Sequence, residues 1–332
     1  MPGLFPAQPS GPAHGEKTLN RLLAGTYIES TMLNRSITPL LITFGLLIHA
    51  PAQANTAVHP YTLEHTEVRS VPSKILPRDY DIFVSLPDSY HKTQKRYPVL
   101  FMTDANYAFP LVRSINRRVN DYGRNLDDVI LVGLSYAKGD SPITSRNRDY
   151  TPTDIVLKKT RRPGQADGPY GQAESYGRFV SEEVIPFVAQ HYRADMSKKI
   201  YVGHSYGSLL GLHLLFRKPD TFDYYVLGSP SLWYDRYHML EVERQYAARN
   251  KNLPARVLMV AGAFEAIQPG SDNPRYAKET DMVKDMQRFE QQLKERGYPG
   301  LSIRSEVIKD EDHLTVFPAL ITRGLLWALP KR

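Results

Sequence analysis

The sequence contains no cysteine among its 332 residues. Without a thiol the chain cannot use a cysteine nucleophile, form a disulfide or bind a metal through sulfur. The ten histidines do not supply a metal site either, because no His-x-x-x-His pair or comparable group of ligands occurs. We therefore expect no metal site and no cofactor.

Long hydrophobic runs are also missing. The apolar stretch at residues 37–48 is about a dozen residues long, whereas a membrane-spanning helix needs roughly 20. Arg35 precedes this stretch and Ala52-Gln53-Ala54 follows it. A basic start, a short apolar core and a small-x-small site are typical of a secretory signal peptide. We expect residues 32–54 to be cleaved, giving a periplasmic protein with no stable membrane insertion; the alternative is a retained anchor.

The chain divides into three parts by composition. Residues 1–31 are rich in Pro, Gly and Ala and lie upstream of the expected signal, so Met32 is the expected true start. Residues 55–332 contain no internal repeat and no low-complexity linker, and we expect them to form a single domain. The net charge of +7 is compatible with an anionic ligand or with solubility alone.

Strand-like and helix-like runs alternate after residue 55, which predicts an α/β fold with a mostly parallel sheet covered on both faces. Residues 80–86 alternate apolar and polar side chains, as an antiparallel edge strand would. Five further strands are expected at residues 97–102, 129–133, 200–203, 224–227 and 257–261, with a last one at 301–308. Helices are expected around residues 176–188, 208–216, 282–296 and 315–329. This order is that of the α/β-hydrolase fold.

The pentapeptide Gly203-His204-Ser205-Tyr206-Gly207 is the most informative motif. An apolar, β-rich run enters it and a Leu-rich, helix-forming run leaves it, which is the context of a nucleophile elbow. We expect Ser205 to be a nucleophile in strained backbone geometry. His204 is expected to be a packing residue whose side chain points away from the reaction.

A serine nucleophile needs a base, and the base needs an acid that orients it. In this fold the chain order is nucleophile, acid, base. Glu265 follows the 257–261 strand, and His313 follows the last strand and is the only histidine beyond residue 238. His313 is therefore the expected base and Glu265 the expected acid. The carboxylates of Asp272, Asp310 and Asp312 are alternatives to Glu265.

An ester-cleaving site also needs N–H donors for the oxyanion of the tetrahedral intermediate. The first expected donor is the backbone N–H of Tyr206, the residue after the nucleophile. The second should come from the loop after the 97–102 strand, at Asn106 or beside it. Asp104 in this loop is also a candidate helix N-cap.

Several segments resemble esterases of the enterobactin (siderophore) esterase type. These are residues 100–106 (LFMTDAN), 145–152 (SRNRDYTP), 203–207 (GHSYG), 228–233 (GSPSLW) and 310–313 (DEDH). They occur in the family's order and span nearly all of the chain after the expected signal. The resemblance implies hydrolysis of carboxylic esters, with Ser205 and His313 as the catalytic pair. In the nearest subgroup it implies cleavage of the trilactone backbone of a catecholate siderophore for iron release.

Residues 138–164 leave the carboxyl end of the 129–133 strand, where ligands bind in open α/β sheets. This segment holds seven basic and three acidic residues, which suits an anionic ferric catecholate. Arg148 and Arg146 are the expected cations for substrate. Tyr150 and Trp233 are candidates to supply flat surfaces for catechol rings; the alternative for either is to pack under the loop.

The predicted partner is thus a small molecule, and no nucleic-acid partner is expected. Two other functions are compatible with these residues. One is a generic carboxylesterase or feruloyl esterase, and the other is a siderophore-binding protein on a hydrolase scaffold without turnover.

Overall fold

The computed structural model describes residues 58–331. The expected signal peptide and the segment before it lie outside the described residues. From Thr62 onward the chain forms one compact unit. Among residues 58–331, no helix is both long and apolar enough to cross a membrane.

A single eight-stranded sheet organises this unit, in the order β1-β2-β4-β3-β5-β6-β7-β8. Its strands are β1 (Thr66–Pro72), β2 (Asp79–Ser85), β3 (Tyr97–Met102), β4 (Ile130–Ala137), β5 (Ala194–His204), β6 (Tyr224–Gly228), β7 (Ala255–Gly262) and β8 (Leu301–Ile308). β2 pairs antiparallel with β1 and β4, and all the other neighbours pair parallel. The mostly parallel sheet of the α/β-hydrolase plan is confirmed.

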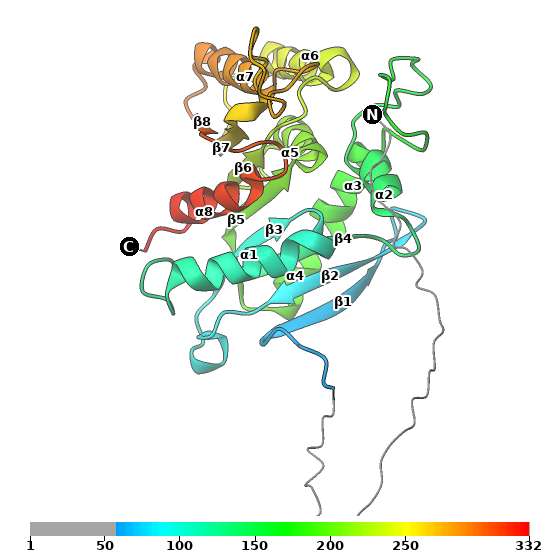
Figure 1. The fold of residues 1–332 in the computed structure, drawn as a ribbon. Coiled ribbons are helices and arrows are strands. Elements are labelled where there is room, and N and C mark those ends of the chain that lie inside the picture. The colour runs from blue at the N-terminus through cyan, green and yellow to red at the C-terminus, as the bar shows by residue number, and fades with distance from the viewer. Residues whose placement is uncertain (1–57, 332) are drawn as a thin grey trace, which may run out of the picture. The chain divides into compact units, whose positions relative to one another are not determined.

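Helices cover both faces of the sheet (Figure 1). They are α1 (Ala105–Asn120), α2 (Pro142–Asp149), α3 (Ala173–Phe179), α4 (Ile185–His191), α5 (Tyr206–Arg217), α6 (Tyr234–Arg249), α7 (Met282–Arg296) and α8 (Val316–Ala328), with short turns η1 (Tyr90–Lys92), η2 (Val180–Val184) and η3 (Ala263–Glu265). α1 and α8 pack on one face over one core cluster. The larger cluster fills the other face under α3, α5, α6 and α7. α5 is buried on nearly every side, as its Leu-rich sequence predicts.

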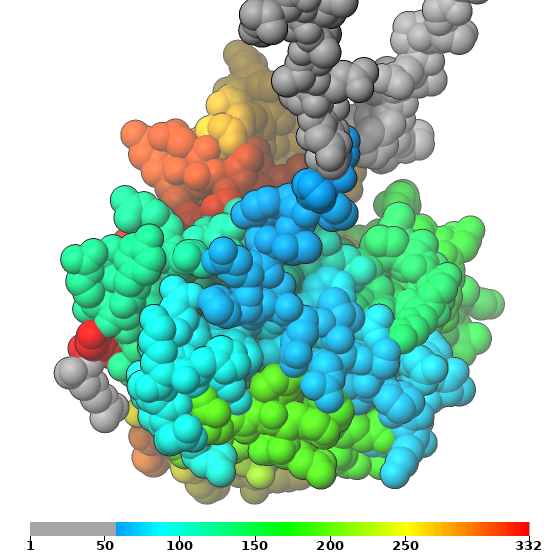
Figure 2. Space-filling model, turned by 90° about the horizontal axis from the view of Figure 1, so that it is seen from below, coloured from blue at the N-terminus to red at the C-terminus, as the bar shows by residue number. Residues whose placement is uncertain are grey.

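The prediction of an edge strand at residues 80–86 is wrong in position. The strand is antiparallel as expected, but β1 covers its outer side and is itself the edge. Figure 2 views the molecule from below, where the blue residues of these first strands lie across the surface. β1 carries Glu67 and Arg69 and ends at Pro72, features that hinder pairing of an edge with another chain.

Candidate active site

Ser205 lies at a sharp turn between the end of β5 and the start of α5. Its backbone has φ 57° and ψ −116°, a strained conformation that the surrounding structure must impose. The two glycines of the motif make this possible. A Cβ on Gly203 would lie 2.4 Å from the carbonyl oxygen of Gly207, and one on Gly207 would lie 2.4 Å from Thr103 Oγ1. Only glycine fits at either position.

A chain of hydrogen bonds joins three side chains that follow three different strands. His313, in the loop after β8, has its Nε2 at 3.1 Å from Ser205 Oγ. Its Nδ1 lies 2.6 Å from Glu265 Oε2, on η3 after β7. The second carboxylate oxygen, Glu265 Oε1, accepts hydrogen bonds from Ser229 Oγ at 2.6 Å and from the backbone N–H of Gly262 at 2.8 Å. This buried carboxylate (4% exposed) therefore holds one orientation against the imidazole.

The alternative carboxylates are engaged elsewhere or exposed. Asp312 accepts from Arg275 Nη2 at 2.8 Å. That hydrogen bond is the main reason its pKa is lowered to about 2. Asp310 is exposed beside Lys309, and Asp272 is exposed. Glu265 is the carboxylate that contacts His313.

The expected oxyanion donors both lie in the first turn of a helix. Tyr206 is the first residue of α5 and Asn106 is the second residue of α1. The first N–H groups of a helix have no partner within it and carry partial positive charge. The Oδ1 of Asn106 accepts from the backbone N–H of Tyr136 at 3.1 Å, which fixes the orientation of the side chain. The backbone N–H of Asn106 is the expected donor to an oxyanion.

Asp104 precedes α1, as expected of an N-cap, but its side chain makes no capping hydrogen bond. Its carboxylate instead accepts from Tyr136 Oη and from Arg146 Nε, each at 2.8 Å. Burial raises the pKa of Asp104, and Arg146 opposes this shift. The network ties α2 to the start of α1, where Asn106 lies.

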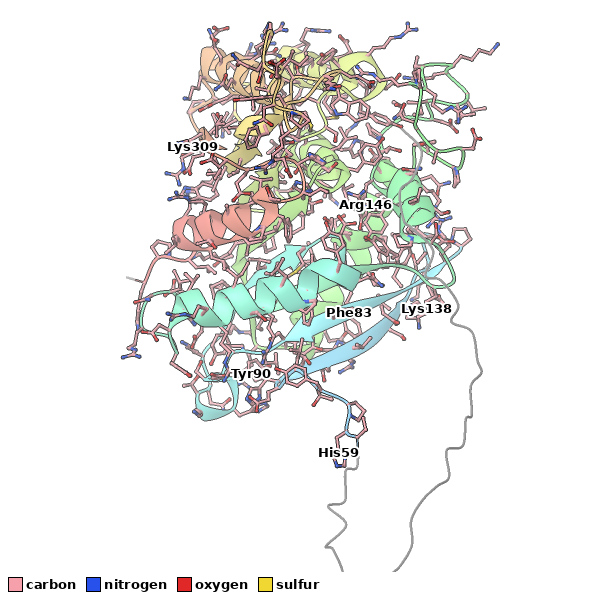
Figure 3. All side chains as sticks on the ribbon, viewed as in Figure 1. His59, Phe83, Tyr90, Lys138, Arg146 and Lys309 are labelled. Atoms are coloured by element: carbon pink, nitrogen blue, oxygen red, sulfur yellow. The ribbon has the colours of Figure 1, made fainter. Side chains whose placement is uncertain are left out.

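Arg146 extends from α2 toward the elbow (Figure 3). Its guanidinium lies 5.8 Å from the centre of the Tyr206 ring and contacts the backbone oxygen of His204 at 3.5 Å. Burial alone would lower its pKa, but the Asp104 carboxylate raises it, so the group is a permanent cation. Arg146 therefore lies beside the site as expected.

The expected substrate contacts of Arg148 and Tyr150 are wrong. Arg148 is 5% exposed and makes a two-pronged ion pair with Asp149, at 2.8 Å for each bond, and a third bond to Asp140 at 2.6 Å. Tyr150 is 1% exposed and its Oη accepts from the backbone N–H of Asp104 at 3.2 Å. Both side chains are buried within the protein and do not face a ligand.

Most other basic residues of the 138–164 segment are paired too. Lys138 contacts Asp81 beside the β1–β2 hairpin, away from Arg146 in Figure 3. Lys158 and Arg161 pair with Asp235 and Asp167. The segment is thus less basic toward a ligand than its composition predicts.

Trp233 is half-buried beside the elbow, with its ring centre 6.2 Å from that of Tyr206. The sequence did not single out its neighbour Arg162, whose guanidinium lies 4.9 Å from the centre of the Trp233 ring. Ser231 was also missed, and its Oγ lies 3.4 Å from Ser205 Oγ. The Ser-Pro-Ser-Leu-Trp segment places both Ser231 and Trp233 at the site.

His204 is buried as expected but does not point away from the site. The centre of its ring lies 4.7 Å from that of His313, and the rings of His204 and Phe317 pack in a T-shaped arrangement. Burial, with smaller contributions from His313 and Arg146, holds its pKa well below the usual value. A neutral His204 therefore packs against the imidazole that contacts Ser205. Among residues 58–331, no three ligating side chains are grouped to hold a metal ion.

Comparison with known proteins identifies the chain's relatives. A family described as "Putative esterase" matches residues 73–303. The ferri-bacillibactin esterase BesA of Bacillus subtilis is 32% identical over 280 residues, covering 81% of this chain and 91% of the relative. A siderophore enterobactin esterase of Emericella nidulans is 25% identical over 269 residues, covering 75% of this chain and 88% of the relative.

Solved structures share the fold at lower identity. The siderophore hydrolase EstA from Aspergillus nidulans has a TM-score of 0.69 at 22% identity, covering 82% of this chain and 97% of that one. The enterobactin and salmochelin hydrolase IroE has a TM-score of 0.58 at 19% identity, covering 80% of this chain and 94% of that one. The chain belongs to the esterase family that matches residues 73–303 and is an esterase of the α/β-hydrolase fold.

Proposed function

We propose that this esterase hydrolyses the ester backbone of a catecholate siderophore through a serine mechanism. The main support for the serine mechanism is the chain of hydrogen bonds from Glu265 through His313 to Ser205, which lies on a strained elbow. The substrate class is supported by the relatives, two of which are named as esterases of ferri-bacillibactin and of enterobactin.

In the acylation step, Ser205 Oγ attacks the ester carbonyl carbon and its proton passes to His313 Nε2. The Glu265 carboxylate stabilises the imidazolium that forms and keeps Nδ1 protonated. The backbone N–H groups of Tyr206 and Asn106 donate to the carbonyl oxygen as it becomes an oxyanion. His313 then gives its proton to the departing alkoxide, which leaves as an alcohol.

Deacylation repeats these steps with water. His313 takes a proton from the attacking water molecule, and the second tetrahedral intermediate collapses to release the carboxylic acid and Ser205. In a cyclic trilactone the first alcohol remains attached to the acyl group, so one turnover opens the ring. Arg146 and Trp233, which both lie beside the Tyr206 ring, would face the substrate's acyl and aromatic groups.

We further propose that the enzyme works in the periplasm and that opening the ring serves iron release. A linear, partly cleaved siderophore holds its metal less rigidly than the intact macrocycle, because cyclisation preorganises the ligand. The support for the location is the signal-like pattern of residues 32–54.

The decisive experiment measures hydrolysis of a ferric tris-catecholate trilactone, of a feruloyl sugar ester and of a small chromogenic ester. We expect turnover of the trilactone at a much higher kcat/KM than the feruloyl ester. In Ser205→Ala, kcat should fall by about 10⁴-fold or more on each substrate that the enzyme hydrolyses. A folded Ser205→Ala protein with normal turnover would exclude the serine mechanism, and preference for the feruloyl ester would exclude the substrate class.

A further inference from the structure

A cavity of about 330 Å³ lies between α6 and α7. Its lining combines apolar surface from Leu232 and Leu240 with the guanidinium groups of Arg236, Arg244 and Arg288. Glu241 accepts from Arg244 at 2.6 Å. Among residues 58–331, no carboxylate forms an ion pair with Arg236 or Arg288, so these two cations are available to a ligand.

One acidic side chain lines the same cavity, and part of it lacks a partner. Asp285, in the first turn of α7, is 9% exposed. The Tyr237 hydroxyl lies close to its carboxylate, but no hydrogen bond of normal geometry reaches its Oδ2 among the described residues. Buried polar atoms are normally hydrogen-bonded. A hydroxyl group of a bound ligand would satisfy this oxygen.

The backbone at the cavity is strained. Asp235, Arg236 and Tyr237 have φ values of 45°, 56° and 63°, a left-handed turn that non-glycine residues avoid. Asp235 holds the turn in place, because its carboxylate accepts from Thr153 Oγ1 at 2.7 Å and from Thr160 Oγ1 at 2.6 Å. The turn puts Arg236 and Tyr237 into the cavity lining, and strain of this kind is concentrated at ligand sites.

The cavity adjoins the active site through consecutive residues. Leu232 lines the cavity, and the next residue, Trp233, packs beside Tyr206 at the elbow. Arg162 lies over the Trp233 ring and donates to Thr280 Oγ1 at 3.1 Å, just before α7. Residues 232–233 therefore connect the cavity lining to the side chains beside the elbow.

We propose that this cavity is a substrate subsite that binds one catechol arm of the substrate in its iron-free form. Arg236 and Arg288 would bind the ionised oxygen of the catechol, Asp285 Oδ2 would accept from its remaining hydroxyl, and Tyr237 and Leu240 would contact the ring. The cavity is at the lower end of the usual range of ligand pockets, roughly 300–1,000 Å³, so it fits one ring and not a whole siderophore. The proposal rests on the proposed function, because it assigns an arm of that substrate.

The test compares a double variant, Arg236→Gln with Arg288→Gln, with a matched control, Arg249→Gln with Arg304→Gln. The control removes two exposed arginines that do not line the cavity. The probe is 2,3-dihydroxybenzoate, whose binding is measured by calorimetry. We expect the double variant to weaken binding about tenfold or more, as loss of charged hydrogen bonds does. Its KM for the iron-free trilactone should rise similarly, while kcat on the small chromogenic ester stays within two-fold of wild type.

Asp285→Asn gives a second, independent readout. This variant should reduce the preference for 2,3-dihydroxybenzoate over benzoate, because the ring hydroxyl loses its carboxylate acceptor. Binding and KM that are unchanged in the arginine double variant would overturn the subsite. If the wild type does not hydrolyse the trilactone, the proposed function fails, and the dihydroxybenzoate titrations still decide whether the cavity binds such a ring.

Discussion

At the scale of single residues, Glu265 decides which nitrogen of His313 carries a proton. Its carboxylate accepts from Nδ1–H, which leaves Nε2 free to accept the proton of Ser205. In Glu265→Gln, the amide group would donate to Nδ1 and favour the opposite tautomer. We expect kcat to fall by about 10²–10⁴-fold, as when such an acid becomes an amide, measured on a chromogenic ester.

Asp312→Asn is the matched control, because Asp312 precedes His313 but pairs with Arg275. Its kcat should stay within a few-fold of wild type. Full activity in Glu265→Gln together with loss in Asp312→Asn would assign the orienting role to Asp312 instead.

His204 makes a prediction about stability and pH. Its pKa is held well below 6.5 in the folded protein, mainly by burial, whereas it returns to about 6.5 in the unfolded chain. As the pH falls below about 6.5, His204 therefore binds a proton in the unfolded state but not in the folded state. The contribution of His204 to the free energy of unfolding is therefore fully present above pH 6.5. It is lost as the pH falls from 6.5 toward the pKa of His204 in the folded protein, by up to about 1.4 kcal/mol per pH unit.

Urea unfolding of wild type and of His204→Phe between pH 7.5 and 5 measures this contribution. We expect the free energy of unfolding of the variant to fall less steeply with decreasing pH. Equal slopes for the two proteins would show that His204 does not contribute. His204→Gln provides a second comparison if the phenylalanine is too large for the site.

At the scale of elements, α2 is held in place through the buried carboxylate of its last residue, Asp149. Asp149 is 1% exposed and depends on the Arg148 guanidinium, with a further hydrogen bond from Tyr80 Oη at 2.9 Å. Arg148→Ala would remove the two-pronged partner of this buried carboxylate and leave Arg78, at 3.8 Å, as its remaining cation. Breaking such a pair costs about 3–5 kcal/mol, which denaturant unfolding would detect as a lower midpoint.

Arg161→Ala is the control for that prediction, because Arg161 makes an exposed pair with Asp167. Its effect on the free energy of unfolding should be within about 1 kcal/mol. A stable Arg148→Ala protein with weaker binding of the ferric substrate would restore Arg148 to a substrate-binding role.

The elements also show what sequence patterns can predict. The sequence of β3 reads as a continuous apolar run because both its faces are buried, and the bounds of α7 follow from its amphipathic pattern. The sequence pattern did not predict β1, because the segment TEVRSVP has few apolar residues. The strand lies at the edge of the sheet, where few of its side chains are buried. The order of Ser205, Glu265 and His313 was predictable because each follows the carboxyl end of a strand.

The direction of a side chain that depends on tertiary partners was not predictable. Arg148 points inward because Asp140 and Asp149 surround it. Arg162 meets Trp233 through a contact between segments about seventy residues apart. Neither contact leaves a periodic signal in the sequence. The composition of residues 138–164 therefore predicted more cations facing the substrate than the structure shows.

At the scale of the whole molecule, the expected export of the chain can be separated from its folding. The compact unit begins at Thr62, so cleavage after Ala54 would leave every strand and helix of that unit intact. An apolar stretch of about a dozen residues followed by Ala52-Gln53-Ala54 is what a signal peptidase cleaves. We expect the exported protein to begin at Asn55.

N-terminal sequencing of the protein from a periplasmic extract tests this expectation. In a variant with Ala52→Leu and Ala54→Leu, the small side chains that the cleavage site requires are replaced, and we expect an uncleaved precursor in the membrane fraction. The kcat of the purified precursor should equal that of the mature protein, because Ser205, His313 and Glu265 all lie within the compact unit. Wild-type protein that keeps residues 32–54 and stays in the membrane fraction would identify the stretch as an anchor.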